Sequence, residues 1–366
     1  MAAYKTLMMK KAILIMLAAF LCVQAGYAQD YVFADASTYT MVGKLFPDTP
    51  NPYHRVDTKV HTGFSSSELA QVKMSAGIII AFRTDSPSIS VKPYYDKEPG
   101  GGTTAPLSRK GFDLYAKKDG KWLWAGCTLA SKSGGQKNVL NSNNIGMTDY
   151  LLYLPLFMEL NKLEIGIWEG YTIEPIDNPF RHRIGIFGSS FTHGYSTSRP
   201  GMTYSAQLSR MTGLQFLNLG CSGNSKLQTY FADVLAAADV DALVFDSFSN
   251  PTAEMIQERL FEFIEIIQAS HPDIPLIFQK TIRREARNFN ETMMAKEEAK
   301  IEMAESMMRK ACRKYKNVFY VTTTDATDEN HETTVDGTHP GDYGYTLWAR
   351  SVAEPISEIL AQYGIK

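Results

Sequence analysis

Residues 183–194 read RIGIFGSSFTHG, and they decide the fold of the second half of the chain. The apolar run RIGIF has the pattern of a short buried strand, and it ends at Gly188. Two serines, Ser189 and Ser190, follow before the stretch closes on a second glycine. The pattern predicts a strand that leads into a tight turn, and it leaves open which serine, if either, carries out chemistry.

Strand-like and helix-like segments alternate downstream of this stretch. Short apolar runs lie at 214–220, 241–247, 275–280 and 317–322. Longer helix-like segments separate them, above all 253–270 and 291–315. Alternation of this kind predicts a parallel sheet with helices on both of its faces.

The first half of the chain has a different pattern. Its strand-like runs lie at 78–82, 88–95, 112–126 and 150–156, and glycine-rich or polar loops connect them. Asp119-Gly120 divides the third run and suits the tight turn of a hairpin. Short runs with turn signals and no long helical period predict an antiparallel β-sandwich. The change of pattern falls near EPIDNPFRH (174–182), whose two prolines interrupt both kinds of element.

The N-terminus has the features of a secretory signal peptide. Three lysines precede the apolar run AILIMLAAFLCV, and small residues follow up to Ala28. The alternative is a membrane anchor, but the run is shorter than the ~20 residues that a membrane span needs. We therefore expect a signal peptide over 1–28, a β-sandwich domain over 29–178 and an α/β domain over 179–366. The expected location is secreted or periplasmic.

Charge and cysteine content exclude several classes of protein. Removing residues 1–28 leaves 34 basic against 39 acidic residues, a net charge of −5, and no basic stripe is present, so nucleic acid is not an expected partner. The remaining cysteines, Cys127, Cys221 and Cys312, are widely spaced and permit at most one disulfide. The histidines show no H-E-x-x-H or comparable spacing, which argues against a zinc enzyme.

Four polar segments of the second half are expected to meet at one edge of the sheet, because ligands of parallel α/β sheets bind beyond the carboxyl ends of the strands. They are GSSFTHG (188–194), NLGCSGN (218–224), DSFSNP (246–251) and DGTHP (336–340). Each segment alone is compatible with an ordinary loop, turn or helix cap. Their joint occurrence in this order indicates a catalytic site.

The order and spacing of these segments resemble the SGNH hydrolases, also called the GDSL esterase/lipase family. Residues 188–194 match the block G-D-S-[LI]-T-x-G, Ser222-Gly223-Asn224 match S-G-[DN], and 336–340 match D-G-x-H-P. Two positions depart from the pattern: Ser189 replaces an aspartate, and Ser247 replaces the glycine of the G-x-N block that ends at Asn250. Upstream, GFDLY (111–115) is similar to the GxDLY-type domain that precedes such hydrolases.

The resemblance implies a role for each matched residue. Ser190 is the nucleophile, His339 is the base and then the acid, and Asp336 orients the imidazole. The backbone N–H groups of Ser190 and Gly223 and the side-chain amide of Asn250 form the oxyanion hole. The implied fold is a flavodoxin-like SGNH three-layer α/β/α domain behind a jelly-roll-like β-sandwich. No cofactor is expected, because the triad supplies both the base and the nucleophile.

The expected function is hydrolysis of acyl esters, acetyl above all, on carbohydrate. Lipid acyl esters or thioesters are the alternative substrates. A non-catalytic carbohydrate-binding protein is a second alternative, since Tyr94, Tyr95, Trp122 and Trp124 could stack on sugar rings. These aromatic residues also fit a simple packing role in the core or at an interface. The α/β-hydrolase motif G-x-S-x-G is not matched, because Thr192 stands two residues after Ser190.

Overall fold

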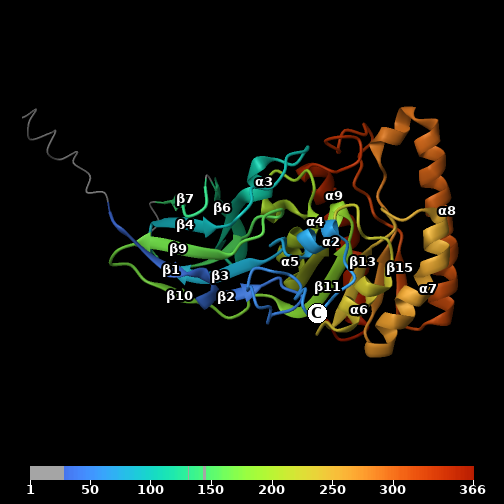
Figure 1. Ribbon diagram of the computed structural model, residues 1–366, viewed down its shortest axis with the longest axis horizontal. Helices are drawn as coiled ribbons and strands as arrows, with labels where there is room; N and C mark the ends of the chain where they lie inside the picture. The colour runs from blue at the N-terminus through green and yellow to red at the C-terminus, as the bar shows by residue number, and fades with distance from the viewer. Residues whose placement is uncertain (1–28, 131, 143–145) are drawn as a thin grey trace, which may run out of the picture.

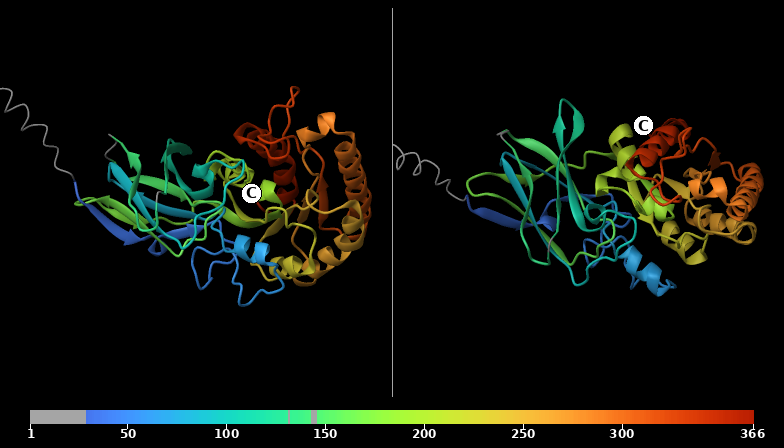
Figure 2. Two further views of the ribbon diagram at one scale, coloured as in Figure 1. Left: turned by 45° about the horizontal axis from the view of Figure 1, so that its top comes forward. Right: turned by 90° about the horizontal axis from the view of Figure 1, so that it is seen from above.

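The computed structural model describes residues 29–130, 132–142 and 146–366. The predicted signal peptide, residues 1–28, lies outside the described residues. Figure 1 shows a β-rich part and an α/β part along the long axis of the molecule, and Figure 2 shows the same two parts from two further sides. Within the described residues, none of the helices has the length and apolarity that crossing a membrane would require.

The β-rich part consists of two antiparallel sheets with a shared core. One sheet has the order β1-β9-β4-β7: Tyr31–Asp35, Lys162–Trp168, Ser88–Tyr94 and Lys137–Asn141. The other has the order β10-β3-β8-β5-β6: Ile173–Pro175, Ile79–Thr84, Thr148–Tyr153, Gly111–Lys118 and Lys121–Leu129, with β2 (Thr40–Val42) also beside β3. Side chains such as Ile89 and Ile165 of the first sheet pack on Ile80, Phe112 and Leu152 of the second. The predicted antiparallel β-sandwich is confirmed.

The hairpin of β5 and β6 has the predicted turn. Lys118 and Lys121 form its last pair, so Asp119 and Gly120 are the two loop residues. Their φ angles are 51° and 76°, both in the left-handed region that a type I′ turn requires. Asp-Gly therefore fixes the register of this hairpin, as the sequence predicts.

The α/β part contains a five-stranded parallel sheet. Its order is β12-β11-β13-β14-β15: Leu214–Gly220, Arg181–Gly188, Ala242–Asp246, Leu276–Gln279 and Val318–Val321. The helices are α4 (Ser190–His193), α5 (Tyr204–Thr212), α6 (Thr229–Ala236), α7 (Ala253–Ser270), α8 (Glu291–Lys314) and α9 (Asp342–Ala361). Two 3-10 helices, η2 (Pro200–Met202) and η3 (Glu285–Phe289), lie in its loops, and η1 (Ala36–Thr38) lies in the β-rich part. The predicted three-layer α/β/α fold is confirmed.

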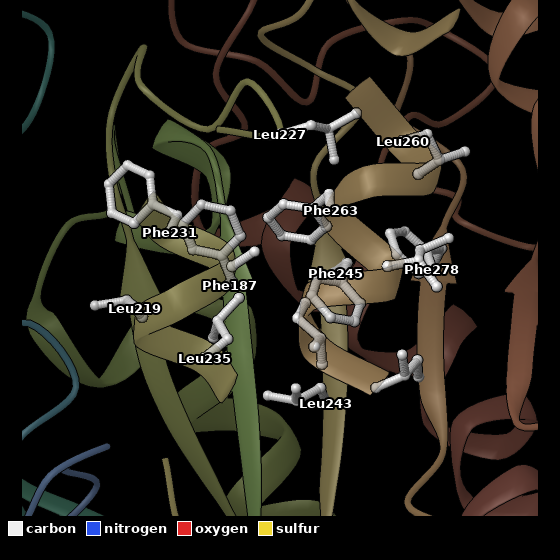
Figure 3. Close-up of a cluster of buried hydrophobic side chains, with 14 of the residues drawn as sticks. Phe187, Leu219, Leu227, Phe231, Leu235, Leu243, Phe245, Leu260, Phe263 and Phe278 are labelled. Carbon is white, nitrogen blue, oxygen red and sulfur yellow. The ribbon is translucent and has the colours of Figure 1, made fainter. Parts of the chain in front are cut away.

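Side chains that alternate along the strands build one core on each face of this sheet. On one face, Phe187 and Phe245 pack against α6, α7 and α8, and Figure 3 shows these rings beside Phe231 and Phe263. On the other face, Ile184, Ile186 and their neighbours pack against α5 and α9. Because both faces are covered, the strands are apolar throughout, which is why their sequences read as continuous hydrophobic runs.

Apolar and polar contacts join the two parts. Tyr115 and Tyr153 of the six-stranded sheet pack with Phe180 and with Ala206 of α5. Arg55, which is fully buried, donates to the backbone carbonyls of Gly220 (3.0 Å) and Asn218 at the end of β12 and to those of Gln71 and Met74. Burial lowers the pKa of Arg55 to about 10. Among the residues described, no carboxylate forms an ion pair with it.

A second polar contact involves the GxDLY-like residues of β5. Asp113 is fully buried and accepts hydrogen bonds from Arg199 Nη1 (2.7 Å), the Gly201 N–H (2.9 Å) and the Trp124 indole (3.1 Å). The hydroxyl of Tyr115 accepts from the same Arg199 nitrogen at 2.7 Å. These contacts connect β5 to the loop that follows α4. Trp124 is 54% exposed and belongs to this interface rather than to the core.

Helix α2 (Ser66–Val72) and helix α3 (Pro106–Lys110) lie in the first half of the chain but close to the α/β part. A capping box begins α2: Glu68 N–H donates to Ser65 Oγ, and the Ser65 N–H donates to the Glu68 carboxylate at 2.7 Å. Gln71 of α2 donates to the Ser222 carbonyl at 3.0 Å. The α2 helix, blue in Figures 1 and 2, thus contacts one of the predicted site loops.

Candidate active site

The turn after β11 presents Ser190 at the start of a short helix. Ser189 is the N-cap of α4, and its hydroxyl oxygen accepts a hydrogen bond from the Phe191 N–H at 3.1 Å. Ser190, the first residue of α4, is 7% exposed. At Gly188 a Cβ atom would lie 2.1 Å from Thr192 Oγ1, so only glycine permits so tight a strand-to-helix turn.

A buried carboxylate lies beneath this turn. Asp246, the last residue of β13, accepts hydrogen bonds from Ser189 Oγ (2.8 Å), the Ser189 N–H (3.1 Å) and Thr192 Oγ1 (3.0 Å). Burial raises the pKa of Asp246 to about 6, although these hydrogen bonds oppose the shift. Ser189, which replaces an aspartate of the family pattern, therefore contacts a carboxylate that the neighbouring strand supplies. Nothing in the sequence pattern predicts this contact.

The structure brings together Ser190, His339 and Asp336. His339 Nε2 lies 2.9 Å from Ser190 Oγ, and His339 Nδ1 lies 2.9 Å from Asp336 Oδ2. The other carboxylate oxygen of Asp336 accepts from the backbone N–H groups of His339 (2.8 Å) and Thr338 (3.0 Å). Partial burial opposes ionisation, but the hydrogen bonds to His339 prevail and lower the pKa of Asp336. The side chain is therefore an anion beside the imidazole.

Packing from η3 holds the loop that carries Asp336 and His339. The Glu285 carboxylate accepts from the backbone N–H groups and hydroxyls of Thr333 and Thr334. The Ala286 N–H donates to the Gly337 carbonyl at 2.7 Å. Two residues separate Asp336 from His339, and these contacts hold the turn that carries both side chains.

The segment that contains Gly223 follows β12 and lies at the same edge of the sheet. Gly223 has a φ of 74°, and a Cβ atom there would meet no other atom within 4 Å, so open space lies on that side of the residue. His193 holds the neighbouring residue in place: His193 Nδ1 lies 3.1 Å from Ser222 Oγ, and Nε2 lies 2.8 Å from the Leu156 carbonyl. Burial lowers the pKa of His193 well below its usual value, so the ring is neutral.

Asn250 lies in the loop after β13. Its side-chain carbonyl accepts from the Ser225 N–H at 3.2 Å, an orientation that leaves the side-chain NH₂ as the donor. The glycine of the G-x-N block is assigned above to Ser247, but a three-residue block that ends at Asn250 begins at Phe248. Ser247 is buried, and its hydroxyl accepts from Ser225 Oγ at 3.2 Å. Ser225 thus contacts both Ser247 and the predicted oxyanion residue.

Two residues that sequence reasoning missed contact the Asp336–His339 pair. Thr103, from the loop after β4, lies with its Oγ1 3.1 Å from Asp336 Oδ2 and 2.8 Å from Ser196 Oγ. The ring of Tyr195 lies 4.4 Å from the His339 ring, centroid to centroid. Thr103 is 233 residues from Asp336, and its glycine-rich loop carries no local signal for such a contact.

The described residues contain no group of three or more His, Cys, Asp or Glu side chains that could hold a metal ion. Cys127, Cys221 and Cys312 are all free thiols. The site itself presents hydroxyl, imidazole, carboxylate and amide groups. A hydrogen-bonded Ser–His–Asp set at the carboxyl edge of a parallel α/β/α sheet is the arrangement of a serine hydrolase.

Comparison with known proteins identifies the family. Residues 181–357 match the model of the GDSL-like lipase/acylhydrolase family, and residues 31–173 match the N-terminus of SGNH-hydrolase-type esterases. The crystal structure of a candidate GDSL-like lipase from Bacteroides ovatus ATCC 8483 is 34% identical in sequence, with a TM-score of 0.88 over 91% of this chain and 98% of that one. The chain belongs to the GDSL-like lipase/acylhydrolase family, and it is a carboxylic ester hydrolase.

More distant structures share the fold. The salicylyl-acyltransferase SsfX3 from a tetracycline biosynthetic pathway is 20% identical, with a TM-score of 0.67 over 91% of this chain and 98% of that one. A family two carbohydrate esterase from Cellvibrio japonicus is 10% identical, with a TM-score of 0.59 over 91% of this chain and 99% of that one. No protein with a curated description matches the sequence.

Proposed function

We propose that the protein is an exported serine esterase that removes acyl groups, principally acetyl, from carbohydrates through Ser190, His339 and Asp336. The observation that carries the proposal is the continuous hydrogen-bonded chain from Ser190 Oγ through the imidazole to the Asp336 carboxylate. A serine hydroxyl becomes a useful nucleophile only when a base accepts its proton, and His339 Nε2 lies at hydrogen-bond distance from it.

The reaction proceeds in two steps. Ser190 Oγ attacks the ester carbonyl carbon while His339 takes the hydroxyl proton, and the tetrahedral intermediate then releases the alcohol, which receives that proton from the imidazolium. Water attacks the acyl-enzyme with His339 again as base, which frees the carboxylic acid and restores Ser190. Asp336 stabilises the imidazolium and keeps Nδ1 protonated, so that Nε2 faces the serine.

The oxyanion of each intermediate needs donors that are already in place. The backbone N–H groups of Ser190 and Gly223 and the side-chain NH₂ of Asn250 supply them in this proposal. The open space at Gly223 and the orientation of Asn250 by Ser225 support the assignment. Removal of one such donor typically lowers the rate by ~10²–10³-fold, so Asn250→Ala is expected to lower kcat by that factor.

The proposed substrate class and location have separate support. Residues 1–28 have the sequence pattern of a cleaved export signal, which supports a location outside the cytoplasm. A structural relative from Cellvibrio japonicus is a carbohydrate esterase. Long-chain lipid esters or thioesters are the competing substrates, and a carbohydrate-binding protein without catalysis is the competing function.

The test is a substrate panel with matched serine variants. Wild type, Ser190→Ala and Ser189→Ala are assayed on acetylated sugars, short-chain esters and long-chain esters, and each is treated with a fluorophosphonate that labels activated serines. We expect Ser190→Ala to lower kcat by roughly 10³-fold or more and to abolish labelling, whereas Ser189→Ala retains labelling. Equal rates for wild type and Ser190→Ala overturn the esterase mechanism, and a preference for long acyl chains overturns the substrate assignment.

A further inference from the structure

A cavity of about 370 Å³ lies beside the proposed catalytic residues, between helix α2 and the loop 96–104. Ala70 and Met74 line one side, Pro99, Gly101 and the rest of the loop line the other, and Phe157 and Tyr195 complete the wall. Every lining residue except Tyr195 precedes residue 178 and thus belongs to the β-sandwich half of the chain. The hydrolase half contributes the catalytic residues, but it contributes little of this cavity.

Three contacts place the cavity next to the reacting groups. Tyr195, which lines it, lies 4.4 Å from the His339 ring. Thr103, in the loop that forms one wall, donates to Asp336 Oδ2 at 3.1 Å. Phe157, also in the wall, stacks on the His193 ring at 4.2 Å between centroids. Tyr195 and Thr103 thus bring one part of the wall beside His339 and Asp336. Phe157 brings another part beside His193, which contacts Ser222.

The loop that forms the wall is held at both ends. At its base, Arg109 donates to the carbonyls of Pro99, Gly100 and Thr104. Glu98 bonds to Tyr95 at 2.6 Å and to Lys110 at 2.5 Å. At its far end, Thr104 Oγ1 accepts from the Ser196 N–H at 2.9 Å. These bonds hold the wall of the cavity without a ligand, which lowers the cost of ordering it on binding.

The position of the cavity decides which half of an ester it can hold. His339 must deliver a proton to the departing alkoxide, so the alcohol half of the ester lies against the imidazole when the bond breaks. The acyl half and its oxyanion face Gly223 and Asn250 instead. Tyr195 both lines the cavity and contacts the imidazole, so the cavity is in a position to hold the alcohol half of the ester. An acetyl group would leave most of the 370 Å³ empty.

The chemistry of the wall favours a sugar ring as that alcohol. Phe157, Tyr195 and Met74 offer apolar surfaces, and Lys97 and Glu159 provide charged groups at the rim. A pyranose presents C–H faces that pack on apolar and aromatic surfaces, with hydroxyls around its edge that bond to polar side chains. The volume lies within the roughly 300–1,000 Å³ range of small-molecule pockets.

We propose that this cavity binds the pyranose ring of the leaving alcohol, so that the β-sandwich half sets the specificity of the enzyme. The inference rests on the proposed esterase function and deepens it. It also assigns the aromatic contribution of the first half to Phe157 rather than to the tyrosines and tryptophans of its strands.

The experiment fills the cavity from either side. Gly101→Phe adds a ring to one wall at a position whose φ is not in the left-handed region and whose Cβ meets no atom within 4 Å. Ala70→Trp adds one to the exposed face of α2 on the opposite wall. Gly146→Phe is the matched control, because Gly146 has the same open surroundings and does not line the cavity.

Hydrolysis is measured on two monoacetate esters that differ only in the alcohol, methyl 6-O-acetyl-β-glucopyranoside and ethyl acetate. We expect both cavity variants to lower kcat/KM for the acetylated glucoside by at least ~10-fold and to leave ethyl acetate within about twofold of wild type, with Gly146→Phe like wild type on both. Equal losses on both esters, or no loss on either, overturn the proposal. Ethyl octanoate is assayed as a third ester, and a loss confined to it shows that the cavity holds the acyl chain and also overturns the proposal.

A second readout separates this proposal from the proposed function. If the wild-type protein hydrolyses no ester, the esterase function fails, and the cavity is then judged by calorimetric titration with methyl β-glucopyranoside. Binding to wild type and Gly146→Phe but not to Gly101→Phe supports the sugar site on its own. Absence of binding to wild type, or equal binding to all three proteins, rejects it.

Discussion

Replacement of Arg199 by alanine is expected to destabilise the fold strongly, because it leaves a buried carboxylate without its ion partner. Asp113 is fully buried and accepts from Arg199 Nη1 at 2.7 Å; only Trp124 and the Gly201 N–H would remain as donors. Removal of one partner of a buried pair costs about 3–5 kcal/mol. Free energies of unfolding of about 5–15 kcal/mol are usual, so the loss is a large share of the total.

The pH dependence of this loss is the more specific part of the prediction. Burial raises the pKa of Asp113 in the folded protein, and Arg199 is the largest opposing influence. Without Arg199 the pKa rises further. A carboxyl whose folded pKa exceeds its unfolded value of 3.8 loses stabilisation as pH rises from the unfolded to the folded pKa. The destabilisation by Arg199→Ala is therefore larger at pH 8 than at pH 5.

Urea denaturation followed by tryptophan fluorescence at the two pH values measures both effects. Arg199→Lys keeps the charge but not the second nitrogen of the guanidinium, and we expect it to lose less stability than Arg199→Ala. The double variant Asp113→Asn/Arg199→Ala removes the buried charge as well and should recover part of the loss at pH 8. A change below about 0.5 kcal/mol, a loss independent of pH, or a double variant less stable than Arg199→Ala would refute the reasoning.

Three further predictions concern the site itself. Thr103→Val removes a hydrogen bond to Asp336 and should lower kcat by ~10-fold with little change in KM, whereas Thr103→Ser should restore it; equal kcat values contradict this role. Gly188→Ala forces a Cβ against Thr192 and should cost ~1–3 kcal/mol, measured as a lower Tm, and an unchanged Tm is the opposing result. Burial raises the pKa of Asp246 to about 6, so the free energy of unfolding of the wild type should fall by ~3 kcal/mol, relative to Asp246→Asn, as pH rises from about 4 to 6. Curves of unfolding free energy against pH that run parallel for the two proteins would argue against this titration.

Local sequence patterns were sufficient for the α/β half of the fold. Strands β12 and β13 are buried on both faces, so each appears as an unbroken apolar run, and the strand ends then place the four polar segments at one edge. Alignment of residues 188–194 with the first sequence block of the family selected Ser190 from the two adjacent serines. In the structure His339 Nε2 lies beside the Ser190 hydroxyl.

The first half was harder because its strands are short and less regular. Strand β9, central in its sheet, escaped prediction: Gly166 interrupts its pattern, and a Cβ there would lie 2.5 Å from Phe33. The close approach of the Phe33 ring requires a glycine at this position, but a glycine within an apolar run is usually interpreted as the end of a strand. Strands β1 and β7 were also not predicted, for a different reason: each is only five residues long.

Contacts between the two halves could not be predicted from either half alone. Thr103 and Asp336 come into contact only when both parts of the chain are folded and packed together. The glycine-rich loop that carries Thr103 has no sequence pattern from which a contact with a residue 233 positions away could be predicted. The GFDLY motif was noticed as a family feature, but its physical reason, the burial of Asp113 against Arg199, depends on three-dimensional structure.

The buried Arg55 has a consequence for the order in which the chain is assembled during synthesis. Residues 29–178 leave the ribosome first, and at that stage Arg55 can bond only to Gln71 and Met74. The carbonyls of Asn218 and Gly220, which complete its shell, belong to a strand translated more than 160 residues later. An incompletely bonded guanidinium opposes its own burial, so we expect Arg55 to become buried only when β12 is in place. Completion of its hydrogen bonds then couples the folding of the first half to that of the second.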